Sequence, residues 1–496
     1  MTLDDLIKTD SIVTDIEYIL EQGKGGVDQI KYVIHMLIVK NKNFHELQNS
    51  SVDEINLDDV ISVLNTKLVY YYLENFQMNS NYLEVFLVKS RKVVVDFILQ
   101  REEVSDKILF LISVISKQAW KCEYIFFYDD EDIEKINKIK EINEIYYNLV
   151  CFMFFEMPKE IIDLISVEFN SDIYIKSMVE MINISQEVKL IDIESSFKIN
   201  DDSGLVREMY EENPYPRWTY NNYLRCKVPL GNIFENFCDR DKTKFLNGRK
   251  NPRVLIAGCG TGKQVVGFCE STLYKEVLAI DISVNSLKYA KYMVEKSDIK
   301  KVSFHQADLL NLDKNSFGTF DYIECVGVLH HLKQPFEGWS NLIDILEPGG
   351  VIKVGLYSAQ ARSSINQFKQ EYKQETDNYD VKSLYEIRSN ILNNNDSPYN
   401  DFFQKWSDFY SASAFRDLVA HVQEEQFTIP KIKEMLKRLN IEFMGFHISR
   451  ELRVKFLNEF GDESKLFNLD YWSEFENKNK DSFYGMYQFW CRKNKS

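Results

Sequence analysis

The residues with the most specific spacing in this chain form a glycine-rich run. Four apolar residues, 254–257, lead directly into Gly258, Gly260 and Gly262. The apolar run is typical of a buried parallel strand, and glycine allows backbone angles and a close approach of ligand to main chain that a Cβ would block. The pattern predicts a strand that turns tightly beneath a nucleoside, followed by a helix from about Gln264.

A dinucleotide-binding loop is the competing interpretation of this run. That loop has its third glycine after two intervening residues, and Lys263 stands at that position here. The spacing Gly-x-Gly-x-Gly therefore argues against a pyrophosphate and favours a ligand that has no phosphate to place.

Two carboxylates follow at the ends of the next predicted strands. Residues 277–280 lead to Asp281, and residues 302–306 lead to Asp308. Asp281 could accept hydrogen bonds from both hydroxyls of a ribose, and Asp308 could accept one from the exocyclic amine of adenine. Either acid alone would more often be a solvated strand end. Their order after the glycine run favours an adenosine site.

Four more strands are predicted from apolar runs, and they complete a sheet. They cover residues 320–326, 351–356, 441–446 and an antiparallel 486–491, with a last crossover helix at 429–439.

These signals together resemble the class I S-adenosylmethionine-dependent methyltransferases, most strongly over residues 205–357. The resemblance implies an α/β fold with a seven-stranded Rossmann-like sheet, S-adenosyl-L-methionine as cofactor and S-adenosyl-L-homocysteine as product. An unrelated nucleotide-binding Rossmann protein is the alternative. The residues that the resemblance implies for cofactor binding are Gly258, Cys259, Gly260, Gly262, Asp281, Ile282, Asp308, Leu309, Cys325 and Gly327.

A proline-rich segment precedes the first strand. Two prolines fix an extended path and display Asn213, Tyr215, Arg217 and Trp218 at set angles. The segment is expected to form a lid over the cofactor, a wall of the substrate pocket, or a rigid elbow between domains. A similar motif, Asn-Pro-Pro-Tyr, follows strand four in nucleic-acid N-methyltransferases, whereas this segment lies before strand one. The segment therefore does not support DNA methylation.

Methyl transfer from a sulfonium mainly requires alignment of the reacting atoms and exclusion of water. A lysine acceptor must arrive neutral, so a nearby side chain that orients or deprotonates it would help. The catalytic candidates are Tyr357 at the end of strand five, His330 and His331 after strand four, and His421 or Glu424 in the insertion. For the pair His330 and His331, capping of the following helix or packing on the cofactor is favoured over catalysis. Tyr410 and Arg416 are candidates for substrate contact.

The composition limits which partners and which cellular compartment we expect. Residues 1–200 hold 35 acidic and 20 basic residues, so nearly all of the net charge of −16 lies in the front part. Without a basic run, affinity for nucleic acid is not expected. Eight cysteines without Cys-x-x-Cys spacing indicate reduced thiols and no metal site, and we expect a cytoplasmic protein without a membrane span or signal peptide.

The front of the chain has few glycines and shows helical spacing of apolar residues, as at Phe86, Val93 and Phe97, which predicts an all-helical domain. We expect this domain to bind a partner or a substrate, and a homodimer is possible. An insertion after strand five should cover the substrate site. The predicted organisation is 1–195 helical domain, 196–250 linker and proline-rich segment, 251–358 cofactor-binding core, 359–426 helical insertion over the substrate site, and 427–496 completion of the sheet.

A second resemblance concerns the acceptor. Two patches of the insertion, 408–410 and 415–424, together with the proline-rich segment 213–218 and the aromatic segment 120–126, resemble large bacterial methyltransferases with a helical N-terminal domain, such as the rickettsial protein-lysine methyltransferases. This resemblance implies methylation of a protein side chain such as lysine. The alternatives are a small-molecule O- or N-methyltransferase and a non-catalytic cofactor-binding interaction module.

Overall fold

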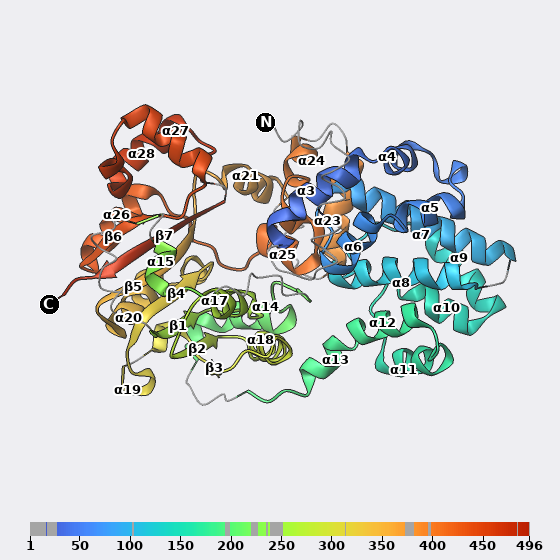
Figure 1. Cartoon of the computed structure of the whole chain (residues 1–496), viewed down its shortest axis with the longest axis horizontal. Coiled ribbons are helices and arrows are strands. Elements are labelled where there is room, and N and C mark those ends of the chain that lie inside the picture. The colour runs from blue at the N-terminus through green and yellow to red at the C-terminus, as the bar shows by residue number, and fades with distance from the viewer. Residues whose placement is uncertain are drawn as a thin grey trace. The chain divides into compact units, whose positions relative to one another are not determined.

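A computed structural model of the chain describes residues 16, 27–101, 104–193, 199–219, 227–234, 237–238, 251–312, 314–372, 381–394, 398–483 and 485–495. The chain divides into two compact units (Figure 1). We call residues 1–190, 217–224 and 373–420 the helical unit, and residues 191–216, 225–372 and 421–496 the sheet unit.

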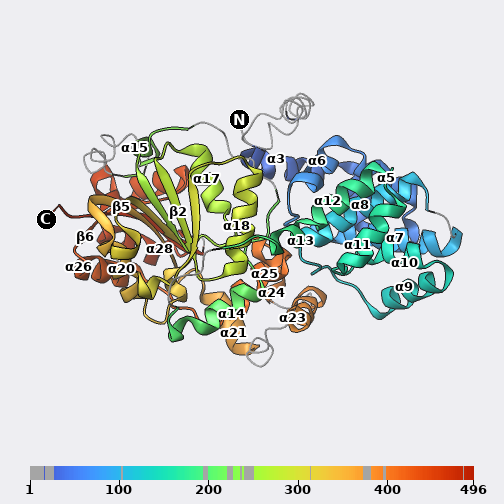
Figure 2. The same cartoon turned by 90° about the horizontal axis from the view of Figure 1, so that it is seen from below.

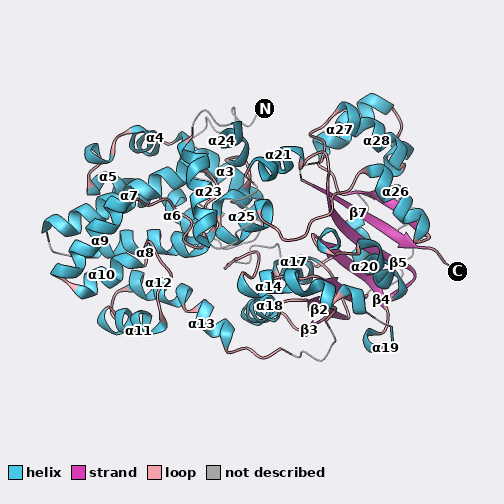
Figure 3. Ribbon diagram, turned by 180° about the vertical axis from the view of Figure 1, so that it is seen from behind, coloured by secondary structure: helices cyan, strands magenta, loops and turns pink. Residues whose placement is uncertain are grey.

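The sheet unit contains seven strands in the order β3-β2-β1-β4-β5-β7-β6 (Figure 3). Strands β1 to β5 are parallel, and β7 is antiparallel to both of its neighbours. This arrangement confirms the predicted fold class and the antiparallel last strand. The bounds are β1 Arg253–Ala257, β2 Glu276–Asp281, β3 Val302–Gln306, β4 Phe320–Val326, β5 Leu346–Tyr357, β6 Ile441–Phe446 and β7 Met486–Lys493.

Both faces of this sheet are covered, which explains why its strands are apolar at successive positions. Leu255 and Ala257 of β1 belong to a core that includes Trp339 and Trp472 from helices of one face. Neighbouring residues of a strand point to opposite faces, so the buried Ile256 faces the other side. Figure 2 shows α17 and α18 beside β2, and α20 and α26 near β5 and β6.

The helices of the sheet unit follow the strands as expected for βα units, and α17 begins one residue before the predicted start. The bounds are η2 Asp201–Ser203, α14 Gly204–Glu212, α15 Leu230–Phe234, α17 Lys263–Ser271, α18 Val284–Lys296, η3 Leu309–Asn311, α19 Lys314–Phe317, η4 Leu329–His331, α20 Pro335–Asp344, α21 Ser363–Glu371, α26 Ile429–Arg438, α27 Arg450–Phe460, η6 Glu463–Phe467 and α28 Leu469–Lys478. The helices α27 and α28 form an insertion between β6 and β7 that the sequence analysis does not assign.

Every regular element described in the helical unit is a helix, as predicted for the front of the chain. The bounds are α3 Val27–Lys40, α4 Lys42–Asn49, η1 Val52–Glu54, α5 Leu57–Leu64, α6 Lys67–Asn75, α7 Asn81–Arg101, α8 Asp106–Lys121, α9 Asp130–Ile142, α10 Glu144–Cys151, α11 Lys159–Glu168, α12 Ile173–Ile182, α13 Ile184–Lys189, α23 Val381–Asn393, α24 Pro398–Phe403, η5 Ser407–Tyr410 and α25 Ala412–Val419. Within the described ranges, each helix is too short or too polar to cross a bilayer.

Helix α8 is the central helix of this unit, because its residues from Ile108 to Lys121 are all buried. Two of its polar side chains have strong partners: Gln118 donates to the carbonyl oxygen of Phe76 at 2.8 Å, and Lys117 pairs with Glu74 at 2.8 Å. Such pairing offsets the cost of burying these polar groups.

Residues 373–420 belong to the helical unit, although they follow β5 in the sequence. Arg388 of α23 pairs with Glu84 of α7 through two hydrogen bonds, one of them 2.8 Å long, and both side chains are buried. A bidentate pair between residues 304 positions apart therefore joins the late helices to the front of the chain.

Candidate functional site

The glycine loop joins β1 to α17 at the carboxyl edge of the sheet. Gly258 and Gly260 have φ angles of 72° and 51°, in the left-handed region that favours glycine. A Cβ on Gly258 would lie 2.3 Å from the Val328 side chain, and one on Gly260 would lie 2.7 Å from the Tyr215 carbonyl oxygen. The sequence predicts that a Cβ at these glycines would block a ligand. At Gly258 and Gly260, however, a Cβ would meet the protein's own atoms.

Asp281 is the last residue of β2, and its side chain is buried. Its Oδ2 accepts a hydrogen bond from Gly260 N at 2.7 Å, and its Oδ1 accepts one from Ser283 N at 2.9 Å. Burial raises the pKa of this carboxyl to about 6, against the opposing effect of the backbone N–H donors. A carboxylate has about four acceptor sites, and the backbone N–H groups of Gly260, Ile282 and Ser283 are directed at Asp281, so acceptor capacity for a ribose hydroxyl remains.

Asp308 lies beyond the end of β3 and is 2% exposed. Its Oδ1 accepts from Leu310 N and caps η3, and its Oδ2 accepts from Asn200 N, both at 2.9 Å. Lone pairs again remain for an amine donor. A buried acid at the end of β2 and another beyond β3 are the acceptors that the ribose hydroxyls and the amine of an adenosine require, so the residues present fit the cofactor.

The proline-rich segment is held by hydrogen bonds to the glycine loop. Thr261 N donates to the Tyr215 carbonyl oxygen at 3.3 Å, and Thr261 Oγ1 donates to that of Pro216. The peptide bond between Tyr215 and Pro216 is cis. Asn213 ends α14, with its N–H donating to Met209 O. The segment therefore contacts the glycine loop directly, and its expected role as a lid, a pocket wall or an elbow stays a prediction.

Helix α14 reaches the same edge through a contact that sequence reasoning missed. The Glu211 carboxylate accepts from Val284 N and Asn285 N, both at 2.8 Å, at the start of α18. Ser283 Oγ donates to the Tyr210 carbonyl oxygen at 3.0 Å. Residues 200–216 therefore touch the ends of β1, β2 and β3. Nothing in the spacing of Tyr210 and Glu211 signals these contacts.

The three predicted catalytic candidates meet in one aromatic cluster beyond β4 and β5. The rings of His330 and Tyr357 stack with centroids 3.8 Å apart, and those of His331 and His421 stack at 3.6 Å. Tyr210 adds its hydroxyl, 3.2 Å from His421 Nε2. We call these five residues the histidine cluster.

His330 and His421 of this cluster are neutral near pH 7. Burial lowers the pKa of His330 and of His421 well below 6.5, and the neighbouring His331 lowers both further. His421 Nδ1 accepts a hydrogen bond from Gln423 N at 3.0 Å, so a neutral ring carries its proton on Nε2. We infer that His421 donates this proton to the Tyr210 hydroxyl oxygen and so orients that group.

Tyr357 is also held by a buried ion pair that sequence reasoning missed. The Arg362 guanidinium lies 3.9 Å from the centre of the Tyr357 ring and makes two hydrogen bonds to Glu424, of 2.8 and 2.7 Å. Burial alone would raise the pKa of Glu424, but the charges of Arg362 and Lys369 outweigh it and lower that pKa. The ring of the Tyr357 candidate is therefore fixed by both His330 and Arg362.

Other predicted site residues lie in the helical unit. Arg217 donates to the Trp120 carbonyl oxygen at 3.1 Å, and Trp218 is buried. Tyr410 is fully buried and donates to the Gln404 carbonyl oxygen at 2.9 Å, and Arg416 is buried as well. Their predicted contact with a lid or a substrate stays a prediction.

The remaining predicted cofactor residues surround the loop. Cys259, Leu309 and Cys325 are buried. Burial raises the pKa of both thiols, so these cysteines are protonated near pH 7. Ile282 follows β2 and is partly buried, and Gly327 follows β4 with a φ of 81°.

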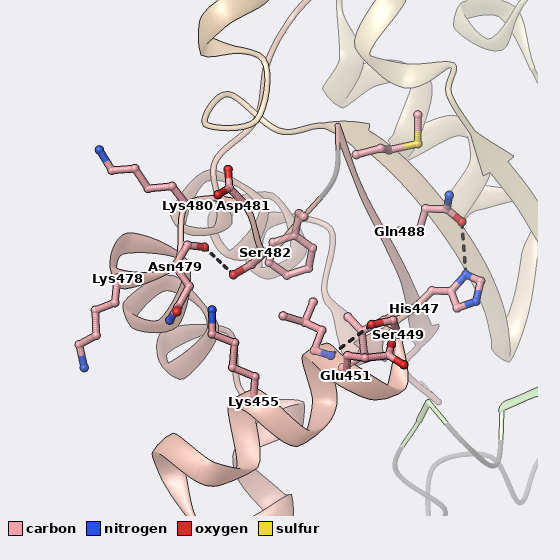
Figure 4. A pocket seen from close by; sticks show the side chains of 14 residues that line it. His447, Ser449, Glu451, Lys455, Lys478, Asn479, Lys480, Asp481, Ser482 and Gln488 are labelled. Atoms are coloured by element: carbon pink, nitrogen blue, oxygen red, sulfur yellow. Dashed lines mark hydrogen bonds between the residues drawn. The ribbon is translucent and has the colours of Figure 1, made fainter. Parts of the chain in front are cut away.

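A cavity of about 710 Å³ lies where β6 ends and β7 begins. The ends of α27 and α28 form much of its wall, and its apolar lining comes from Ile448, Leu452, Phe483 and Met486. Figure 4 shows polar side chains around it, including His447 and Gln488, whose side chains lie 3.5 Å apart. The sequence analysis did not predict this cavity.

Comparison with known proteins relates part of the chain to a protein family. Residues 249–437 match the family described as Methyltransferase domain. An uncharacterised protein of Synechococcus is 30% identical over 214 residues, which cover 41% of this chain and 51% of that protein. A ubiquinone biosynthesis O-methyltransferase of Psychrobacter arcticus is 24% identical over 162 residues, covering 32% of this chain and 59% of the relative.

Among solved structures, PKMT2 from Rickettsia typhi is 17% identical, covers 49% of this chain and 48% of its own, and superposes with a TM-score of 0.36. The chain thus spans about half the length of PKMT2 and of the Synechococcus relative. Residues 249–437, which contain strands β1 to β5, the glycine loop and the two acids, are thus similar to the methyltransferase domain family.

Proposed function

We propose that the sheet unit binds S-adenosylmethionine at the carboxyl edge of β1, β2 and β3 and transfers its methyl group to an acceptor. The observation that carries this proposal is the placement of Asp281 against Gly260 of the glycine loop and of Asp308 just beyond β3, the strand next to β2, each buried and with acceptor capacity left. Asp281 would hold the ribose, and Asp308 the adenine amine.

The bound cofactor supplies an electrophilic methyl group: an acceptor lone pair forms the new bond to carbon, the C–S electron pair passes to sulfur, and the acceptor proton leaves. The protein's own contribution is orientation and exclusion of water. Residues 200–216 cover the edge, and the histidine cluster offers the hydroxyls of Tyr357 and Tyr210. His330 and His421, being neutral, add no positive charge that would repel a cationic centre.

The predicted protein lysine acceptor stays a prediction. A small-molecule acceptor is the second candidate, and the cavity beside β7 favours it, because its volume lies within the roughly 300–1,000 Å³ of small-molecule sites.

The proposal is tested by calorimetric titration of S-adenosylmethionine into the wild type, Asp281→Ala and Asp281→Asn. Loss of charge-assisted hydrogen bonds of roughly 1.5–3 kcal/mol should weaken binding about ten- to 150-fold in Asp281→Ala. Glu295→Ala, which changes an exposed carboxylate on α18, is the matched control and should bind as the wild type does. Undiminished affinity in both Asp281 variants would remove the ribose role.

Transfer itself is tested with cofactor that carries a tritiated methyl group, incubated with whole-cell lysate. Label in an acceptor supports the enzyme. Tight cofactor binding without any transfer would instead support the non-catalytic binding module.

A further inference from the structure

The cavity beside β7 adjoins the edge where the cofactor site lies. Met486 lines the cavity and is the first residue of β7, where it pairs with Tyr357. A Cβ on Gly327, just after β4, would lie 3.8 Å from Met486 Cε, and the next residue, Val328, packs on Gly258. Met486 therefore lies close to Gly327 after β4, and the cavity lies at the same edge of the sheet as the glycine loop.

The charged side chains around the cavity differ in whether they already bind another group of the protein. Lys478 makes ion pairs with Glu459 at 2.9 Å and Glu474 at 2.7 Å, and its side chain points away from the cavity, as does that of Lys480 (Figure 4). Glu451 is bound to the start of its own helix: hydrogen bonds to its own backbone and to Ser449 lower the pKa of its carboxyl.

Lys455 is the cation placed to meet a ligand. Its ammonium lies near Asn479 at the end of α28 (Figure 4) and 6.0 Å from the centre of the Phe475 ring, and it forms no ion pair with any residue that the structure describes. The lining also carries the acids Glu451 and Asp481, so attraction of an anion is confined to the neighbourhood of this exposed ammonium. The apolar lining in turn suits a body of aromatic or aliphatic carbon.

We propose that this cavity is the acceptor pocket and that it takes a small amphipathic molecule with one anionic group, a carboxylate or phosphate, bound by Lys455. The apolar body would lie on Leu452, Phe483 and Met486, with the nucleophile directed past Met486 toward the end of β4. This inference rests on the proposed methyl transfer and names its substrate class. It assigns a role to the insertion 447–485.

The first test measures binding with 8-anilinonaphthalene-1-sulfonate, a fluorescent aromatic anion. Lys455→Glu should weaken its binding at least tenfold, because attraction becomes repulsion, and Met486→Trp should do so by filling the cavity. Lys480→Glu is the matched control, since it makes the same charge change on a side chain directed outward, and it should stay within twofold of the wild type. Lys455→Glu and Lys480→Glu should both bind S-adenosylmethionine with unchanged affinity.

The second test adds tritiated cofactor to a deproteinised cell extract and separates the labelled products by charge. We expect label in small acids, reduced at least tenfold in Lys455→Glu and unchanged in Lys480→Glu. Equal binding of the fluorescent anion by wild type, Lys455→Glu and Met486→Trp would overturn the inference, as would label confined to proteins when whole lysate is used. Failure of the wild type to bind S-adenosylmethionine would instead overturn the proposed function.

Discussion

At the scale of single residues, Asp281 serves both the fold and the proposed cofactor site. Its carboxylate fixes the N–H groups of Gly260 and Ser283, which sets the shape of the loop after β1 and the start of α18. The same burial that makes these hydrogen bonds strong also raises its pKa to about 6. Its charge therefore changes within the working range of many assays.

We predict that affinity for S-adenosylmethionine falls as the pH is lowered through about 6. The ribose hydroxyls donate to the ionised carboxylate, so binding favours the deprotonated form and is lost as Asp281 gains a proton. The dissociation constant, measured from pH 5 to 8, should rise about tenfold for each unit of pH below the pKa of the free protein. Asp281→Asn should bind weakly at every pH, and a slope that persists in this variant would assign the titration to another group.

We predict that Tyr357→Phe lowers turnover roughly five- to tenfold, about the worth of one hydrogen bond, and leaves the affinity for S-adenosylmethionine unchanged. Phenylalanine keeps the ring contacts with His330 and Arg362, so the change isolates the hydroxyl. Single-turnover kinetics and cofactor titration separate the two effects. Tyr471→Phe, on α28, is the control, and equal turnover in all three proteins would remove Tyr357 from the mechanism.

At the scale of elements, α14 and the segments on either side of it act as one cover over the edge of the sheet. They are tied to β3 through Asn200, to α18 through Glu211 and to the glycine loop through Tyr215. Each of these three contacts holds the segment against one neighbouring element. Loss of one contact should therefore increase local unfolding of the two elements that it joins.

We predict that Glu211→Ala speeds amide hydrogen exchange at Val284 and Asn285 about five- to thirtyfold. The two N–H groups at the start of α18 lose a charged acceptor, which costs about 1–2 kcal/mol. Exchange monitored by mass spectrometry of the peptide that contains these residues gives the measurement. Glu208→Ala, an exposed site on the same helix, should leave this exchange unchanged; similar rates in both variants would show that Glu211 does not hold α18.

At the scale of the whole molecule, the helical unit is built from distant parts of the chain. The buried pair of Glu84 and Arg388 joins α7 to α23, and neither charge is accessible to water. Removal of one partner leaves an uncompensated buried charge, whereas replacement of both by apolar side chains avoids that cost.

We predict that Glu84→Ala destabilises the helical unit by about 3–5 kcal/mol, measured as the free energy of unfolding in urea with circular dichroism. The double variant Glu84→Leu/Arg388→Met should be closer to the wild type than Glu84→Ala is. Asp58→Ala, which breaks an exposed ion pair with Lys107, should change stability by under about 0.5 kcal/mol. A Glu84→Ala protein as stable as this control would contradict the assigned role of the pair.

The sequence by itself determined the features that depend on neighbours along the chain. Apolar runs located all seven strands, and the glycine spacing with Asp281 and Asp308 located the proposed cofactor edge, because strand burial and turn geometry leave local patterns. Only the tertiary structure decided that Tyr210, Glu211 and Arg362 join the site, that residues 373–420 pack with the front helices, and that α27 and α28 enclose a cavity. These features depend on contacts between residues that are far apart in the sequence, such as buried polar groups and their partners. Contacts of this kind leave no periodic pattern in the sequence.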